Sequence, residues 1–169
     1  MPNELPLHTE VLRTRPDVTA VVHTHPMAGL DIRPIIGAFD IPGTRLAAGG
    51  VPVYPRGVLI RNRDLAGEMT RFMDDRPVVV LRGHGLTSTG SCVEEAVLRA
   101  ISIDTIARLC LTVTQAGGTL RDLPPEDMRE LPDLGSGFNH ATAWRHELAR
   151  IDAAVSGTTP ARAAGHRLE

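Results

Sequence analysis

Two short runs of apolar, β-branched residues predict buried strands. They cover residues 18–23, VTAVVH, and residues 77–83, PVVVLRG. Between them, residues 26–57 contain many prolines and glycines, which indicates loops around short elements. One of these elements is predicted to be a third strand over residues 50–55, GVPVYP.

Helical patterns alternate with these strands. The strongest covers residues 91–118, where Ser91 and Glu94 form a capping box and the pair Gly117–Gly118 ends the helix. The other predicted helices are residues 6–15, with Pro6 in the first turn; residues 65–73, with Asp64 as N-cap; residues 124–131; and residues 139–155. Helices that alternate with buried strands predict an α/β fold built in layers.

Size and composition exclude several classes of protein. The 169 residues suffice for a domain with a core, and we predict one domain over residues 1–155 followed by a disordered tail over 156–169. The net charge of −2 and the 3% of aromatic residues argue against nucleic-acid and membrane partners. Cys92 and Cys110 have neither metal-site nor redox spacing, so we expect a cytoplasmic protein.

Three histidines lie at the ends of the two longer predicted strands. His23 and His25 are two residues apart, and in a strand such residues point to the same face, about 6–7 Å from each other. His84 follows the other strand, between two glycines that leave its ring unshielded. Each motif alone also fits ordinary polar residues at a strand end or turn. Together they are typical of an open, catalytic zinc site, although Mn²⁺, Fe²⁺, Co²⁺ or Ni²⁺ would accept the same ligands.

A carboxylate completes this set of candidates. Glu4 lies just before the first predicted helix. Near a metal it can serve as a fourth ligand, as a general acid/base, or as both in turn. Considered alone, Glu4 fits a solvated terminal residue better. His8, four residues later, is either a supporting group or a surface residue.

The order and spacing of these residues resemble the class II aldolase/adducin family. The resemblance extends from Glu4 to about Gly118 and rests on E-x-x-x-H at 4–8, RPDVTAVVHTHP at 15–26, AAGGVPVYP at 47–55, RGHGLTSTG at 82–90 and EEAVLRAISIDTIAR at 94–108. It implies a three-layer α/β/α fold with a mixed, mostly antiparallel sheet, and a homotetramer that acts on a small molecule. It also implies a divalent metal, zinc first, held by His23, His25 and His84, with Glu4 as the catalytic acid/base.

Two departures from the family pattern affect the expected reaction. Family members usually carry a segment before the carboxylate that matches Glu4, so we expect the N-terminal part of the family domain to be missing here. Sugar-phosphate aldolases often present a tyrosine hydroxyl where this chain has Phe39, and a phenyl ring cannot donate a proton. Arg82 is either a two-point clamp for a carboxylate or a surface ion-pair residue. We assign Arg82, Phe39 and His8 to substrate binding.

An apolar wall and a carboxylate clamp suit a hydroxylated aromatic acid. The segments GAFDIPGTRLAAGGVPVYPRGVLI, VVVLRGHGLTSTG and ELPDLG also resemble the dihydroxyphthalate-decarboxylase branch of the family. We therefore predict a metal-dependent lyase that decarboxylates a hydroxylated aromatic carboxylic acid through a metal-stabilised enolate. The alternatives are an aldolase that cleaves a sugar phosphate or related hydroxy-carbonyl compound, and a non-catalytic adducin-type interaction domain. The three retained histidines argue against the last of these.

Overall fold

A mixed sheet organises the chain. In the computed structural model, which describes residues 2–26, 41–132 and 136–157, four strands form one sheet in the order β1-β4-β3-β2. They are β1 (Ala20–Thr24), β2 (Val53–Tyr54), β3 (Val78–Leu81) and β4 (Gly85–Gly90). Strand β4 is antiparallel to both β1 and β3, whereas β2 is parallel to β3. The expected mixed, mostly antiparallel sheet is confirmed.

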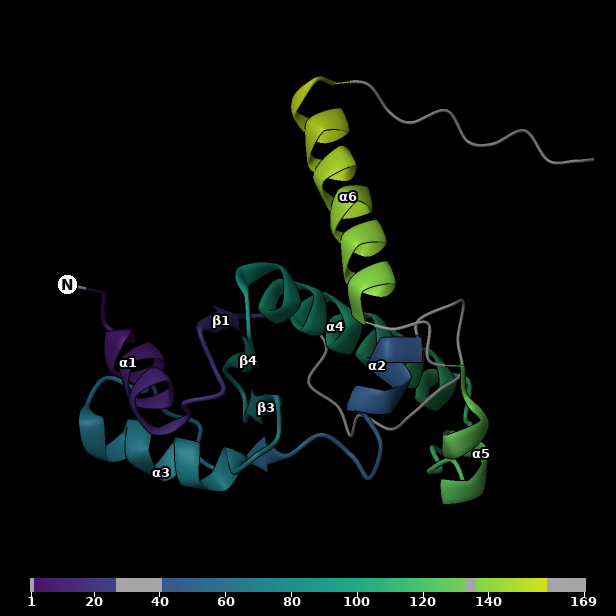
Figure 1. Ribbon diagram of the computed structural model, residues 1–169. Coiled ribbons are helices and arrows are strands. Elements are labelled where there is room, and N and C mark those ends of the chain that lie inside the picture. The colour runs from purple at the N-terminus through teal and green to yellow at the C-terminus, as the bar shows by residue number, and fades with distance from the viewer. Residues whose placement is uncertain (1, 27–40, 133–135, 158–169) are drawn as a thin grey trace, which may run out of the picture. The chain divides into compact units, whose positions relative to one another are not determined.

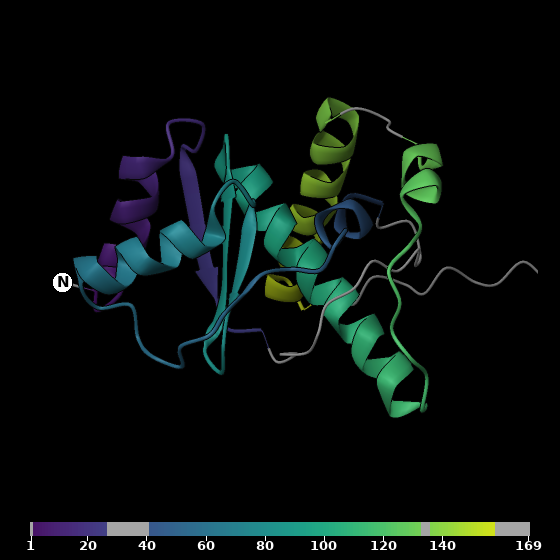
Figure 2. The same ribbon diagram turned by 90° about the horizontal axis from the view of Figure 1, so that it is seen from below.

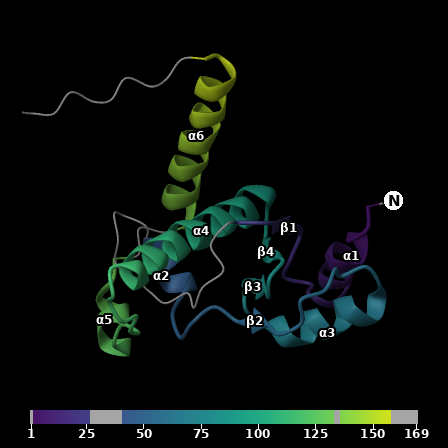
Figure 3. The same cartoon turned by 180° about the vertical axis from the view of Figure 1, so that it is seen from behind.

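Helices cover both faces of this sheet. Helices α1 (Leu5–Thr14) and α3 (Arg63–Met73) lie on one face, and α2 (Ile41–Leu46) and α4 (Val93–Gln115) lie on the other (Figures 1 and 2). The view from behind shows the same separation of α1 and α3 from α4 by the strands (Figure 3). The short helix α5 (Pro125–Glu130) follows, and the Arg45 guanidinium of α2 donates to the carbonyls of Met128 and Leu131. The predicted three-layer α/β/α architecture is confirmed.

Each face of the sheet has its own apolar cluster, and the strands alternate between them. Val79 and Leu81 point toward α1 and α3, whereas Val78 points toward α4, as the period of two requires. The cluster under α1 and α3 contains Leu7, Val11, Val18, Tyr54, Ile60, Ala66, Met69, Met73, Val79 and Leu81. The cluster under α4 contains Ala47, Val51, Val78, Leu86, Ala100, Ile103, Ile106, Ala107 and Cys110.

Strand β4 was not predicted, although it is a central strand and all six of its residues are buried. Its sequence, GLTSTG, lacks the apolar run that marked its neighbours. The structure satisfies its buried hydroxyls instead: Ser88 Oγ donates to the Ala96 carbonyl at 2.7 Å, and Thr89 Oγ1 donates to the Pro77 carbonyl at 3.1 Å. Hydrogen bonds therefore replace the apolar side chains that a buried strand usually carries.

The helix boundaries agree with prediction more closely than the capping residues do. The N-cap of α3 is Asn62, whose side chain accepts from the Leu65 N–H at 2.9 Å, so the assignment of Asp64 was wrong. Before α4, Ser91 is bound by Glu95 rather than by Glu94, because Glu95 Oε2 accepts from both the N–H and the hydroxyl of Ser91.

The predicted stop of α4 is confirmed. The Gly117 N–H donates to the Thr114 carbonyl and the Gly118 N–H donates to the Val113 carbonyl, and φ of Gly117 is +78°. These two bonds are those of a Schellman motif, which uses glycine for its left-handed residue.

By compactness the chain divides into two units, Met1–Asp133 and Leu134–Glu169. In the second unit the structure describes one helix, α6 (Ser136–Val155). The single domain over 1–155 stays a prediction, and most of the predicted tail, residues 158–169, lies outside the described residues. Among the described helices none combines the length and the apolar character needed to cross a membrane.

Candidate metal centre

Three imidazoles meet at one end of the sheet. His23 is the penultimate residue of β1, His25 follows that strand, and His84 ends the short turn between β3 and β4. Thr24 is paired with Leu86, so His25 comes next to the start of β4, just after His84. The three ring centroids are 4.9 to 5.0 Å apart in every pair. The predicted convergence of two strand ends is therefore present.

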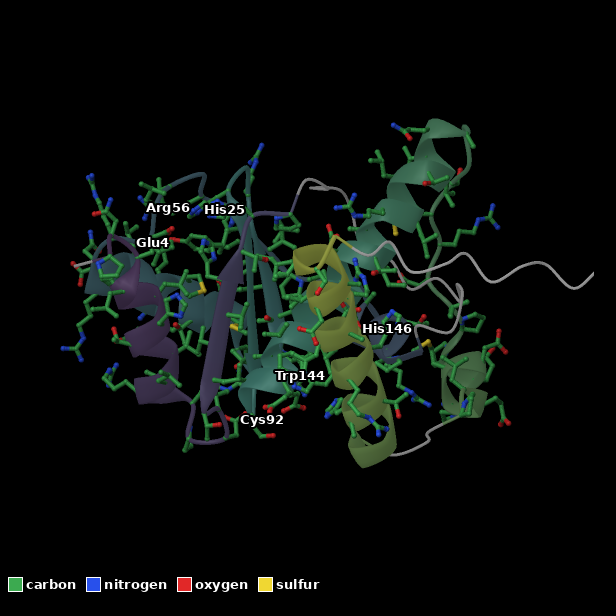
Figure 4. The ribbon with its side chains drawn as sticks, turned by 90° about the horizontal axis from the view of Figure 1, so that it is seen from above. Glu4, His25, Arg56, Cys92, Trp144 and His146 are labelled. Atoms are coloured by element: carbon green, nitrogen blue, oxygen red, sulfur yellow. The ribbon has the colours of Figure 1, made fainter. Side chains whose placement is uncertain are left out.

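Glu4 reaches the same place from the start of α1. Its Oε1 accepts from the Ile60 N–H at 3.0 Å. Its Oε2 lies 3.2 Å from His84 Nε2 and 3.5 Å from His23 Nε2. Figure 4 shows Glu4 and His25 near each other at one end of the sheet. One carboxylate oxygen is thus fixed by the backbone, and the other faces the imidazoles.

The four donor groups fit a divalent cation. One donor atom each from Glu4, His23, His25 and His84 lies within 4.8 Å of all the others, and the two Nε2 atoms of His23 and His25 are 3.0 Å apart. Ligands bound at about 2.0–2.1 Å in a tetrahedron are about 3.4 Å from one another. Both ring nitrogens of His84 are buried without a hydrogen-bond partner among the described residues. A cation bound at Nε2 would satisfy that nitrogen, which is otherwise costly to bury.

The environment of His23 favours its neutral, metal-binding form. Burial lowers the pKa of His23 below its ordinary value, and the neighbouring His84 and His25 act in the same direction, while the Glu4 carboxylate opposes them. Its Nδ1 lies 3.3 Å from Oγ1 of Thr87, a fully buried residue of β4. A proton on Nδ1 that is donated to Thr87 leaves the Nε2 lone pair directed at the other ligands.

The glycines beside His84 have different roles. A Cβ on Gly85 would collide with the Thr24 carbonyl oxygen and would lie 2.7 Å from Cδ2 of the His25 ring. Gly83 has φ of +64°, a left-handed conformation that glycine adopts without strain, but a Cβ there would meet nothing within 4 Å. Gly85 therefore makes room for His25, whereas Gly83 shapes the turn.

Neither His8 nor Arg82 is one of the four clustered donors. His8 is half-buried on α1, and Arg82 is exposed in the β3–β4 turn. Phe39 lies outside the described residues. Two supporting groups, Thr87 and the Ile60 N–H, were missed by sequence reasoning. They act on His23 and Glu4 across 64 and 56 residues of chain, and neither has a local sequence signal.

The chain belongs to the family described as class II aldolase and adducin N-terminal domain, whose model matches residues 1–111. This assignment agrees with the fold and with a His/Glu cluster that suggests a divalent metal. The resemblance stated from the sequence motifs is therefore confirmed.

Within that family the chain is similar to proteins named 3,4-dihydroxyphthalate decarboxylase. It is 72% identical over 160 residues to one from Arthrobacter keyseri, covering 90% of this chain and 64% of the relative. It is 52% identical over 157 residues to another from Rhodococcus jostii, covering 89% and 65%. The chain thus spans just under two thirds of the length of these relatives.

Among solved structures, the chain resembles an aldolase II superfamily protein from Pseudomonas syringae. The TM-score is 0.66 at 24% identity, and the match covers 86% of this chain and 62% of the other. At this identity the likeness supports the fold alone.

Proposed function

We propose that this chain is a metal-dependent lyase that decarboxylates a hydroxylated aromatic carboxylic acid, with 3,4-dihydroxyphthalate as its substrate. The observation that carries the proposal is the convergence of Glu4 and three imidazoles within 4.8 Å. The identity of 52–72% with the decarboxylase relatives supports the choice of reaction and substrate.

His23, His25 and His84 would hold the cation through their Nε2 atoms. Three imidazoles with positions left for substrate are typical of catalytic zinc, so zinc is our first choice, with Mn²⁺, Fe²⁺ and Co²⁺ as alternatives. When bound, the cation supplies Lewis-acid stabilisation of negative charge that develops on substrate oxygens.

Glu4 is placed to move a proton at Oε2. In the reaction the bond between the ring carbon and the carboxylate carbon breaks. Carbon dioxide leaves, and the electron pair of the broken bond stays on the ring. The ring carbon then needs one proton, which a protonated Glu4 Oε2 can donate. The Ile60 N–H holds Oε1 and so keeps Oε2 directed toward the site throughout the transfer.

The substrate has two carboxylates, of which the reaction removes one. We propose that Arg82 binds the carboxylate that stays on the ring. Arg82 is exposed, lies two positions before His84, and its guanidinium makes no ion pair within the described structure. Arg56, in contrast, is already bound to Glu68 at 2.7 Å. A free guanidinium can take a carboxylate in two parallel hydrogen bonds. Phe39 and His8 remain proposed as further pocket residues.

The family resemblance leads us to propose a cytoplasmic homotetramer as well. Cys92 and Cys110 form no disulfide bond, which agrees with a reducing compartment.

The test compares the two lyase reactions directly. The purified chain is loaded with Zn²⁺ or Mn²⁺ and incubated with 3,4-dihydroxyphthalate, or with dihydroxyacetone phosphate and an aldehyde. We expect release of carbon dioxide and a dihydroxybenzoate from the first substrate only. Aldol product from the second mixture would make the protein an aldolase. If metal binds and neither reaction occurs, the proposed activity is wrong for this chain.

A further inference from the structure

The segment from Tyr54 to Ile60 runs alongside the metal centre. The Tyr54 carbonyl accepts from the Arg82 N–H at 3.2 Å, and a Cβ on Gly57 would lie 3.3 Å from the Arg82 carbonyl oxygen. At the other end of the segment, the Ile60 N–H donates to Oε1 of Glu4. The segment therefore extends from the β3–β4 turn, which carries one of the three imidazoles, to the carboxylate that faces them.

Arg56 lies on this segment as one half of an exposed ion pair. Its Nη1 donates to Oε2 of Glu68 on α3 at 2.7 Å, and the two side chains are 47% and 43% exposed. Figure 4 shows Arg56 at the same end of the sheet as Glu4 and His25. An ion pair with this exposure contributes little to stability, so either partner can be replaced without loss of the fold.

The ion pair lies against the end of β2. Tyr54, two residues before Arg56, is fully buried. Burial raises the pKa of Tyr54, and the Glu68 carboxylate acts in the same direction, while the Arg56 guanidinium opposes both. Both charged groups are therefore close to the phenol, and the pair is held at the strand end rather than extended into solvent.

Two guanidinium groups are thus available on neighbouring segments beside the metal centre. Arg82 is exposed in the β3–β4 turn. Arg56 retains donors after its contact with Glu68, because that contact engages Nη1 and a guanidinium has five N–H groups. The charge of Arg56 is offset by Glu68, so the two arginines differ in how strongly they should hold an anion.

We propose that Arg56 binds the substrate carboxylate that leaves as carbon dioxide, while Arg82 binds the one that stays. This inference rests on the proposed function, because 3,4-dihydroxyphthalate carries two carboxylates on adjacent ring carbons. Each carboxylate then has its own guanidinium, which provides charge-assisted hydrogen bonds. Glu68 is a positioning residue in this arrangement, since it holds Arg56 through Nη1 and offsets its charge.

The offset of charge matters for the reaction. The leaving carboxylate loses its negative charge as carbon dioxide departs, and that charge moves into the ring. A guanidinium without a partner would stabilise the bound carboxylate more than the transition state, and the step would be slower. Because Glu68 shares the guanidinium, Arg56 can orient the leaving group without holding it too tightly.

The test first measures binding without reaction. Phthalate has both carboxylates and no hydroxyl, and benzoate has a single carboxylate; each is titrated calorimetrically into the Zn²⁺-loaded chain. We expect Arg56→Gln to weaken phthalate binding about tenfold and to change benzoate binding by less than about twofold. In Glu68→Gln the amide oxygen still accepts from Arg56 but the charge is no longer offset, so phthalate should bind about threefold more tightly.

Arg108→Gln is the matched control. Arg108 is also exposed and is bound to Asp104 at 2.8 Å, but it lies on α4, which covers the other face of the sheet (Figure 2). This variant should bind both compounds like the parent. With 3,4-dihydroxyphthalate as substrate, Glu68→Gln should lower KM and kcat together, because the bound carboxylate is stabilised without equal stabilisation of the transition state.

Several results would overturn the proposal. They are a parent chain that binds phthalate no more tightly than benzoate, variants of Arg56 and Glu68 that shift phthalate affinity in the same direction, and equal effects on the two compounds. Lower melting temperatures in both variants with an unchanged ratio of the two affinities would show that the pair is only structural. If the affinities follow the expected pattern and no carbon dioxide is released from 3,4-dihydroxyphthalate, the proposed reaction is wrong and the site for two carboxylates stands.

Discussion

The Ile60 N–H donates to Oε1 of Glu4 at 3.0 Å, and this bond joins the start of α1 to the segment that leads into α3. Glu4 would otherwise be a surface residue near the beginning of the chain. The bond fixes one oxygen of its carboxylate, and the second oxygen then lies 3.2 Å from His84 Nε2. The backbone of one segment therefore determines where the Glu4 carboxylate, our proposed acid/base group, is held.

Glu4→Gln should separate the chemical role of the carboxylate from its structural role. The amide oxygen can still accept from the Ile60 N–H, so we expect metal affinity within roughly tenfold of the parent. Turnover should fall much further, because an amide cannot cycle a proton. Isothermal titration with Zn²⁺ and a carbon dioxide release assay measure the two quantities. Glu4→Ala is the companion variant, and it should also lose about 1 kcal/mol of stability because it leaves the Ile60 N–H unpaired. Unchanged turnover in Glu4→Gln would remove Glu4 from the mechanism.

His84→Ala should remove most of the metal affinity. Two histidines and a carboxylate form a weaker site, and His84 is the only ligand from the β3–β4 turn among those we propose. The buried nitrogens that the substitution removes have no hydrogen-bond partner in the described structure, so folding should be little impaired. Metal titration and thermal unfolding of the metal-free protein check both parts. A variant that binds as tightly as the parent would show that the third ligand is another residue.

Thr87→Val should weaken metal binding although Thr87 itself is not a ligand. Valine has nearly the same shape in this fully buried position but cannot accept the His23 Nδ1 proton at 3.3 Å. We expect a tenfold to hundredfold loss of affinity, the usual range for groups that orient a metal ligand. Thr87→Ser keeps the hydroxyl and should restore most of the affinity. Equal affinities in the two variants would mean that the hydroxyl has no orienting role.

Gly85→Ala and Gly83→Ala form a matched pair within one turn. The first places a Cβ against the Thr24 carbonyl and the His25 ring, so it should displace His25, lower metal affinity and cost about 1–3 kcal/mol. The second should cost about 1–2 kcal/mol through its left-handed backbone, with little effect on the metal. Metal titration and chemical denaturation distinguish them. If both variants lose the same metal affinity, the close approach of His25 to Gly85 is irrelevant to the site.

Arg82→Lys should weaken a carboxylate substrate more than a neutral analogue. Lysine retains the positive charge but lacks the planar fork that binds two carboxylate oxygens together. We expect a rise in KM for dihydroxyphthalate and little change in metal affinity. Competition by catechol, which has the hydroxyls without the carboxylates, provides the comparison. An equal loss for both compounds would contradict the proposed clamp.

The parts of the site that depend on local geometry could be predicted from the sequence. The period of two in a strand placed His23 and His25 on one face, and the glycines around His84 indicated an open turn. The sequence did not predict β4. Gly85 and Gly90 are needed there because other atoms approach their backbones closely, and Ser88 and Thr89 are accommodated by hydrogen bonds of their hydroxyls. A strand built in this way has no apolar period to detect. The contacts of Thr87 and Ile60 also depend on pairings between segments far apart in the chain.

The proposed ligands lie on three segments: the entry to α1, the end of β1 and the β3–β4 turn. An unfolded chain cannot present these groups together, so a cation that requires all of them binds the folded form alone. Metal at a hundredfold excess over its dissociation constant would then add about 2.7 kcal/mol to the free energy of unfolding. The cation would link α1 to the sheet. The free energy of unfolding would therefore rise and fall with the concentration of free metal.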